Sequence, residues 1–110
     1  MLKPLLLSLS IVAASNDDPL PTVVSIDYCA DQYTLVLADR PQILALSNEA
    51  RMNHSYYRDL AIGIPQIGTS LEEVLALKPD IVLRTWQGNA RSIALMETAG
   101  LKVVTVPYVA

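Results

Sequence analysis

The sequence predicts an α/β fold, in which a single lobe holds a mostly parallel, roughly four-stranded sheet flanked by helices in the Rossmann-like manner. Its strand-like segments are short apolar runs without alternation, which is typical of strands covered on both faces. Helical segments separate these runs, as βαβ crossovers require, and we expect right-handed connections. The length of 110 residues and mass of 12.0 kDa allow one domain at most.

The clearest predicted element is a helix that begins after Ser70 and ends before Pro79. Ser70 and Glu73 have the spacing of a capping box, in which each side chain satisfies a free backbone N–H at the helix start. Pro79 ends the helix because the residue before a proline is pushed out of the α region. Residues 81–83 follow as an uninterrupted apolar run and predict a buried strand. The helix has one apolar face, formed by Leu71, Val74, Leu75 and Leu77.

The other elements follow from similar signals. Strands are predicted at residues 22–27, 43–46 and 102–106, and helices at residues 30–38 and 89–99. Gly100 is expected to end the last helix in the left-handed conformation. A polar loop with one helical turn near residues 56–60 is expected between residues 47 and 61, and a short extended stretch around residues 66 and 67.

The N-terminal residues predict export to the periplasm. Lys3 precedes an apolar run at residues 5–14 that ends in small residues, the pattern of a signal peptide cut after Ala14 or Ser15. The alternative is an unprocessed hydrophobic first helix or a membrane anchor. The expected organisation is a signal peptide at residues 1–15, a linker at 16–21 and a folded lobe at 22–110. After cleavage the product would not be membrane-embedded.

Charge and cysteine content exclude several classes of function. The formal net charge is −3 and no basic cluster is present, so we expect no nucleic-acid or anionic-lipid surface. Cys29 is the only cysteine, which excludes an intramolecular disulfide. His54, the only histidine, does not make a metal site by itself.

Aromatic residues follow the predicted strands and indicate a binding surface. Tyr28, Trp86 and Tyr108 each come a few residues after a strand end, where open α/β sheets bind their ligands. With Arg84 and Gln87 beside them, they predict a concave floor for a large, partly apolar ligand. The alternatives are that the rings only cover helix ends, and that Arg84 forms a surface ion pair with Asp80 or Glu97.

Catalysis has little support in the sequence. A small α/β enzyme could use Asp27, Asp31, Cys29 and His54, all near predicted strand ends, and we keep it as an alternative. Acids at a helix start are, however, ordinary partners of the helix dipole, and a lone cysteine is usually a partly buried thiol. No nucleophile elbow or phosphate-binding glycine loop is present, so we expect a protein that is not an enzyme.

Three segments carry a family resemblance: VVSIDYCADQYTLVLA (23–38), LEEVLALKPDIVL (71–83) and WQGNARSIALMETAGLKVV (86–104). They resemble the N-terminal lobe of the helical-backbone, or class III, periplasmic binding proteins. That family delivers vitamin B12, ferric siderophores or haem to ATP-binding-cassette (ABC) importers. The Trp-Gln-Gly-Asn loop is similar to that of the B12-binding members.

The resemblance implies a metal-chelate ligand held between two lobes, with Tyr28, Trp86 and Tyr108 on this lobe's side of the cleft. It implies no resident cofactor, and it implies that Glu72 docks on a basic residue of the importer's permease. The residue alone is equally compatible with an acid that stabilises its own helix start.

The chain departs from the family pattern, because it ends where the family's long connecting helix would start. We therefore expect a truncated lobe that binds its ligand weakly or not at all without the second lobe, or an interaction module that pairs with a separate second lobe. The module's signature would be an exposed apolar patch. A corrinoid is slightly favoured over a siderophore or haem, because a siderophore would rely more on Arg84 and Arg91.

Overall fold

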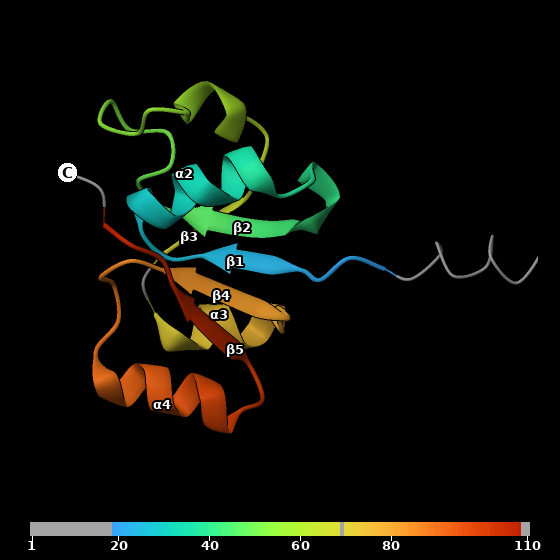
Figure 1. Ribbon diagram of the computed structural model, residues 1–110, viewed down its shortest axis with the longest axis vertical. Coiled ribbons are helices and arrows are strands. Elements are labelled where there is room, and N and C mark those ends of the chain that lie inside the picture. Colours follow the sequence, from blue (N-terminus) through green and yellow to red (C-terminus); the bar gives the residue numbers. More distant parts are fainter. Residues whose placement is uncertain (1–18, 69, 109–110) are drawn as a thin grey trace, which may run out of the picture.

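The computed structural model describes residues 19–68 and 70–108, which form one five-stranded parallel sheet (Figure 1). The strand order is β3-β2-β1-β4-β5, and every neighbouring pair is parallel. The strands are β1 (Val23–Ser25), β2 (Ile43–Ser47), β3 (Gln66–Ile67), β4 (Ile81–Arg84) and β5 (Lys102–Thr105). The carboxyl ends of all five strands therefore meet at one edge of the sheet.

Helices cover both faces of this sheet. In Figure 1, α2 lies on one side of the sheet and α3 and α4 lie on the other. The helices are α2 (Tyr28–Leu37), α3 (Leu71–Leu77) and α4 (Ala90–Thr98), with 3-10 turns η2 (Arg40–Gln42) and η3 (Arg58–Ala61). The predicted fold class is confirmed. The fifth strand is the short β3, which lies in the stretch predicted as extended.

The helix boundaries show how local chemistry sets the elements. The helix predicted from residue 30 begins two residues earlier, because Asp27 caps it by accepting the N–H of Ala30 at 2.8 Å. In α3, Ser70 Oγ accepts the N–H of Glu73 at 3.3 Å, as predicted. Lys78 ends α3 in the left-handed conformation with φ of 50°, and Gly100 has φ of 93° just beyond α4.

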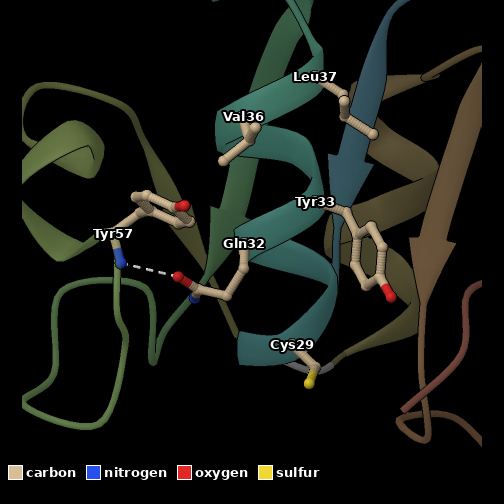
Figure 2. A pocket seen from close by; sticks show the side chains of 6 residues that line it. All are labelled: Cys29, Gln32, Tyr33, Val36, Leu37 and Tyr57. Atoms are coloured by element: carbon tan, nitrogen blue, oxygen red, sulfur yellow. Dashed lines mark hydrogen bonds between the residues drawn. The ribbon is translucent and has the colours of Figure 1, made fainter. Parts of the chain in front are cut away.

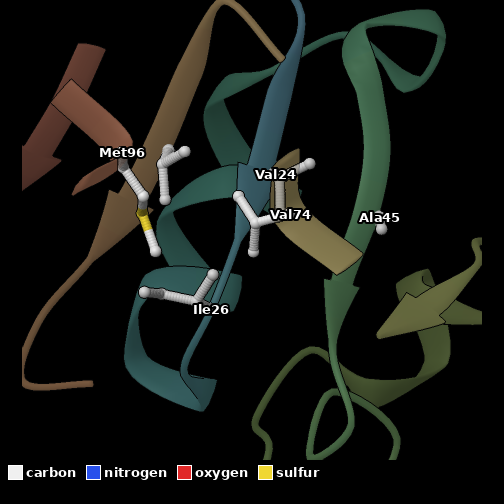
Figure 3. Packing of buried hydrophobic residues seen from close by; sticks show 6 residues of the cluster. Val24, Ile26, Ala45, Val74 and Met96 are labelled. Atoms are coloured by element: carbon white, nitrogen blue, oxygen red, sulfur yellow. The ribbon is translucent and has the colours of Figure 1, made fainter. Parts of the chain in front are cut away.

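The main core lies between the sheet and the helices α3 and α4. It contains Val24, Ile26, Ala45, Val74, Val82 and Met96, five of which are labelled in Figure 3. A second cluster lies under η3 and contains Ile43, Leu46, Ala50, Ala61 and Ile64. Strands β1 and β4 lie inside the sheet. All three residues of β1 are buried, whereas in the run predicted as buried at residues 81–83 only Val82 is buried and its two neighbours are half-buried.

The Lys-Pro-Asp segment after α3 fastens the start of β4 to the start of β1. The Asp80 carboxylate accepts the backbone N–H of Thr22 at 2.8 Å and its hydroxyl at 3.2 Å. The Thr22 hydroxyl in turn accepts the N–H of Asp80 at 3.0 Å. Asp80 is therefore occupied by Thr22.

The predicted signal peptide at residues 1–15 and the first half of the predicted linker, residues 16–18, lie outside the described residues. Within 19–68 and 70–108, none of the helices has the length and apolar character needed to cross a membrane.

Candidate functional site

Three rings predicted from the sequence lie together at the carboxyl edge of the sheet. Tyr28 is the first residue of α2, Trp86 follows β4 and Tyr108 follows β5. The ring centroids of Tyr28 and Trp86 are 4.9 Å apart at an interplanar angle of 68°. Those of Trp86 and Tyr108 are 5.5 Å apart at 73°. Both pairs are edge-to-face, the arrangement that aromatic side chains prefer.

A fourth ring extends this set. The centroid of His54 lies 4.6 Å from that of Tyr28, at an interplanar angle of 78°. His54 Nε2 also lies 3.5 Å from Glu49 Oε1. We call His54, Tyr28, Trp86 and Tyr108 the ring row. The sequence indicated His54 as a catalytic candidate and as an insufficient metal ligand, not as a member of this set. Its position in the loop after β2 was the signal that could have placed it at this edge.

Three rings of the row, those of Tyr28, Trp86 and Tyr108, line a hollow of about 410 Å³ together with Thr85. Trp86 and Tyr108 are 41% and 60% exposed, so ring surface is available to a ligand. Partial burial, followed by the nearby Tyr108 and Cys29, raises the pKa of the Tyr28 hydroxyl. Tyr28 is therefore a neutral phenol at neutral pH and can donate or accept a hydrogen bond.

Asp27 holds the backbone segments that carry Tyr28 and Trp86. Its Oδ1 accepts the N–H of Ala30, and its Oδ2 accepts the N–H groups of Thr85, Trp86 and Gln87 at 2.6, 3.1 and 3.3 Å. The side chain is 2% exposed. Its carboxylate oxygens thus already accept four backbone N–H groups.

Asp31 is also buried, and it joins α2 to the end of β2. Its carboxylate accepts the Ser47 hydroxyl at 2.6 Å and the Ser47 N–H at 3.0 Å. Burial raises the pKa of Asp31 to about 6, assisted by the charge of Asp27 and opposed by the hydrogen bonds from Ser47. The two acids of the catalytic alternative are therefore both occupied in holding elements together.

Arg84 does not form the ion pair with Asp80 or Glu97 that the sequence left open. Its guanidinium donates to the Gln87 carbonyl at 2.7 Å, the Thr105 hydroxyl at 2.8 Å and the Gly88 carbonyl at 3.4 Å. Arg84 therefore braces the loop after β4 and ties it to β5. In the described part of the chain, the close approach of a basic side chain to a carboxylate is that of His54 to Glu49.

The outer face of α2 carries an apolar groove of about 420 Å³ (Figure 2). Gln32 fastens one wall of it by accepting the N–H of Tyr57 at 2.8 Å. Val36 and Leu37 are 53% and 77% exposed. The groove is lined by Cys29, Gln32, Tyr33, Val36, Leu37 and Tyr57. It is an exposed apolar patch of the kind that an interaction module would show.

The remaining candidates lie apart or give no cluster. Glu72 is exposed in the first turn of α3. Cys29 is a free, half-buried thiol in the α2 groove. Across residues 19–68 and 70–108, no three His, Cys, Asp or Glu side chains come close enough together to hold a metal ion.

This chain is similar to known proteins in its fold, and the comparison of structures is the one that finds them. No family model and no curated protein matches the chain. Solved structures do. The periplasmic heme-binding protein BhuT, in complex with two hemes, is 26% identical with a TM-score of 0.58, over 80% of this chain and 34% of BhuT.

Two further solved structures agree. An ABC transporter substrate-binding protein from Listeria monocytogenes is 19% identical with a TM-score of 0.59, over 84% of this chain and 35% of its own. The periplasmic vitamin B12 binding protein BtuF of Vibrio cholerae is 18% identical with a TM-score of 0.58, over 81% and 33%. The chain thus spans about a third of the length of the solved proteins it matches.

Proposed function

We propose, from the confirmed resemblance to the N-terminal lobe of the class III periplasmic binding proteins, that this chain provides one wall of the ligand site of an ABC importer's binding protein. The solved proteins that it matches are named as binding proteins, not as enzymes. The proposed ligand is a metal chelate, and the proposed place of action is the periplasm.

The ring row is the observation that carries the proposal. Neighbouring rings contact edge-to-face across an exposed hollow at the edge of the sheet where α/β folds bind ligands. Large apolar ligands are usually held by aromatic side chains, with a small number of polar groups that fix orientation. The polar groups along the row are the hydroxyls of Tyr28 and Tyr108, the indole N–H of Trp86 and the imidazole of His54.

A flat metal tetrapyrrole fits this surface better than a ferric siderophore. An anionic siderophore would need positive charge, and the guanidinium of Arg84 is engaged by its own loop and by Thr105. Arg91 is exposed on α4 and is not among the residues that line the hollow, so it does not supply that charge there. A tetrapyrrole, whether haem or a corrinoid, relies instead on contact with ring faces and edges. BhuT, which matches at 26% identity, is described in complex with two hemes.

The proposed protein partner is the importer's permease, with Glu72 as the docking residue. Glu72 is an exposed acid in the first turn of α3. An exposed charge at an interface contributes orientation and association rate more than affinity. Charge reversal at Glu72 is expected to leave ligand binding unchanged and to weaken coupling to the permease. Unchanged coupling would remove this role.

The experiment that tests the binding function is a fluorescence titration of the purified chain with haem, cyanocobalamin and a ferric siderophore. Trp86 is the only tryptophan and lies in the ring row, so its emission reports on this site. We expect saturable quenching by a tetrapyrrole after inner-filter correction. Calorimetry of a Trp86→Ala variant is the control, and it should show weakened binding.

Two results would contradict the proposal. Saturable binding that is unchanged in Trp86→Ala would place the ligand elsewhere. Absence of binding of all three ligands, at concentrations where the chain remains folded, would reject a working site on this lobe alone.

A further inference from the structure

We propose that Asp27 is a positioning residue, whose buried carboxylate sets the separation of Tyr28 and Trp86 and thereby the shape of the ring row. This inference rests on the proposed function for its binding consequence. Its structural consequence can be tested without any ligand.

The two oxygens of Asp27 hold two different segments of the chain. Oδ1 caps α2 at the N–H of Ala30, and α2 begins with Tyr28. Oδ2 accepts three successive N–H groups from residues 85–87, the segment that carries the Trp86 ring. A single carboxylate thus fixes the backbones of two neighbouring rings that lie 58 residues apart in the sequence.

The Trp86 ring is only partly covered by the rest of the fold. It is 41% exposed, and its described ring contacts are with Tyr28 and Tyr108. Tyr108 is itself 60% exposed. The position of the indole therefore depends on the backbone of residues 85–87, and that backbone is held by Asp27.

Two acceptor oxygens are needed for this arrangement. A carboxylate is an acceptor on both oxygens, so it can serve Ala30 on one side and three N–H groups on the other. An asparagine has one acceptor oxygen, and its NH2 group would face N–H donors on the remaining side. A buried donor without a partner is costly, so the loop would move away. Hydrogen bonds to an ionised acceptor are also the stronger kind.

The chain offers a closely matched control in Asp31. Asp31 lies one turn further along α2 and is equally buried, but it holds Ser47 of β2 instead of residues 85–87. Asp27→Asn and Asp31→Asn are thus the same chemical change at two buried positions of one helix. Of the two, only Asp27 accepts hydrogen bonds from the backbone that carries Trp86.

A third variant separates helix capping from the holding of the loop. Serine is a good N-cap, so Asp27→Ser should preserve the start of α2. Its short side chain carries a single oxygen that cannot serve Ala30 and the three N–H groups of residues 85–87 together. Far-UV circular dichroism of each variant serves as the control that the helices are retained.

The first measurement follows Trp86 in the ligand-free chain. We expect Asp27→Asn and Asp27→Ser to increase acrylamide quenching of Trp86 and to lose its near-UV dichroism, whereas Asp31→Asn retains both signals. The second measurement is haem or cyanocobalamin affinity. We expect a loss of about tenfold in the Asp27 variants and less than about twofold in Asp31→Asn.

The outcomes distinguish the two proposals. If the wild type binds no tetrapyrrole, the binding function fails, while the spectra of Trp86 still decide the positioning role. If the Asp27 variants keep the quenching, dichroism and affinity of the wild type, the positioning role is overturned.

A measurement on the wild type covers the case in which the Asp27 variants do not fold. Amide hydrogen exchange should show protection at Thr85, Trp86 and Gln87, although all three lie in a loop. Rapid exchange at these amides would show that Asp27 does not hold the loop in solution.

Discussion

Asp31 is a buried carboxyl group whose ionisation the fold opposes. Its pKa rises from 3.8 to about 6, chiefly because burial removes the carboxylate from water. The folded state therefore binds this proton more tightly than the unfolded state. Its contribution to stability is full below about pH 4 and is lost as the pH rises through 6.

The corresponding prediction concerns the difference between wild type and Asp31→Asn. Between about pH 4 and 7, the wild type should lose roughly 1–3 kcal/mol of unfolding free energy relative to the variant. Urea unfolding at several pH values measures this difference, with Asp59→Asn, at an exposed position, as the control. A difference that does not change with pH would show that Asp31 titrates normally.

Arg84 shows what sequence reasoning could reach at the level of a residue. Its place directly after a buried strand was predicted, and so was its nearness to aromatic side chains. Its partners were not, because Gln87, Gly88 and Thr105 come together only through the turn after β4 and the pairing of β4 with β5. The predicted role of Arg84 in ligand binding remains a prediction, with its guanidinium now known to be engaged.

At the scale of elements, the end of α3 is locally unfavourable. Lys78 adopts a left-handed conformation, with φ of 50° and ψ of 53°, that glycine tolerates far better than residues with a Cβ. The sequence predicted that Pro79 would end the helix here. It did not predict the left-handed backbone, because helices often end at such a position on glycine.

We therefore predict that Lys78→Gly stabilises the chain by about 0.5–1 kcal/mol, as relief of strain outweighs the added flexibility of the unfolded state. Ala76→Gly is the matched control within the same helix, and it should destabilise the chain by about 1 kcal/mol. Thermal or urea unfolding measures whether each variant raises or lowers the free energy of unfolding. Destabilisation by both variants would mean that Lys78 is not strained in solution.

The helix α2 shows a limit of pattern reading. The sequence predicted a largely apolar helix between two strands, which is correct. Its buried residues are nevertheless Ala30, Asp31 and Thr34, while Val36 and Leu37 face outward. Local periodicity gives the helix but not the side that meets the sheet, because the polar inner face becomes acceptable only when Ser47 supplies partners for Asp31.

At the scale of the whole molecule, the outward-facing Val36 and Leu37 give the surface an apolar groove on the outside of α2. An exposed apolar surface of this kind favours association with other surfaces, including other copies of the chain. Leu37 is the most exposed large apolar residue there, at 77%, and therefore contributes little to folding.

We predict that Leu37→Lys changes the unfolding free energy by less than about 0.5 kcal/mol and lowers concentration-dependent light scattering. Leu60→Lys, on η3 and outside the groove, is the control at an exposed leucine, and it should lower the scattering less. A loss of stability well above that value in Leu37→Lys would show that Leu37 is covered in solution. Equal scattering from both variants would remove the groove as the site of association.

The sequence by itself determined the α/β class, the parallel sheet, the places of the main helices and strands, and the edge where the aromatic residues gather. These follow from short-range signals, namely unbroken apolar runs, the Ser70 cap, and the helix ends at Pro79 and Gly100. The tertiary structure decided the rest. His54 joined the ring row, Asp27 became the support of Trp86, and α2 turned its apolar side outward, because each depends on contacts between segments far apart in the chain that only the folded sheet brings together.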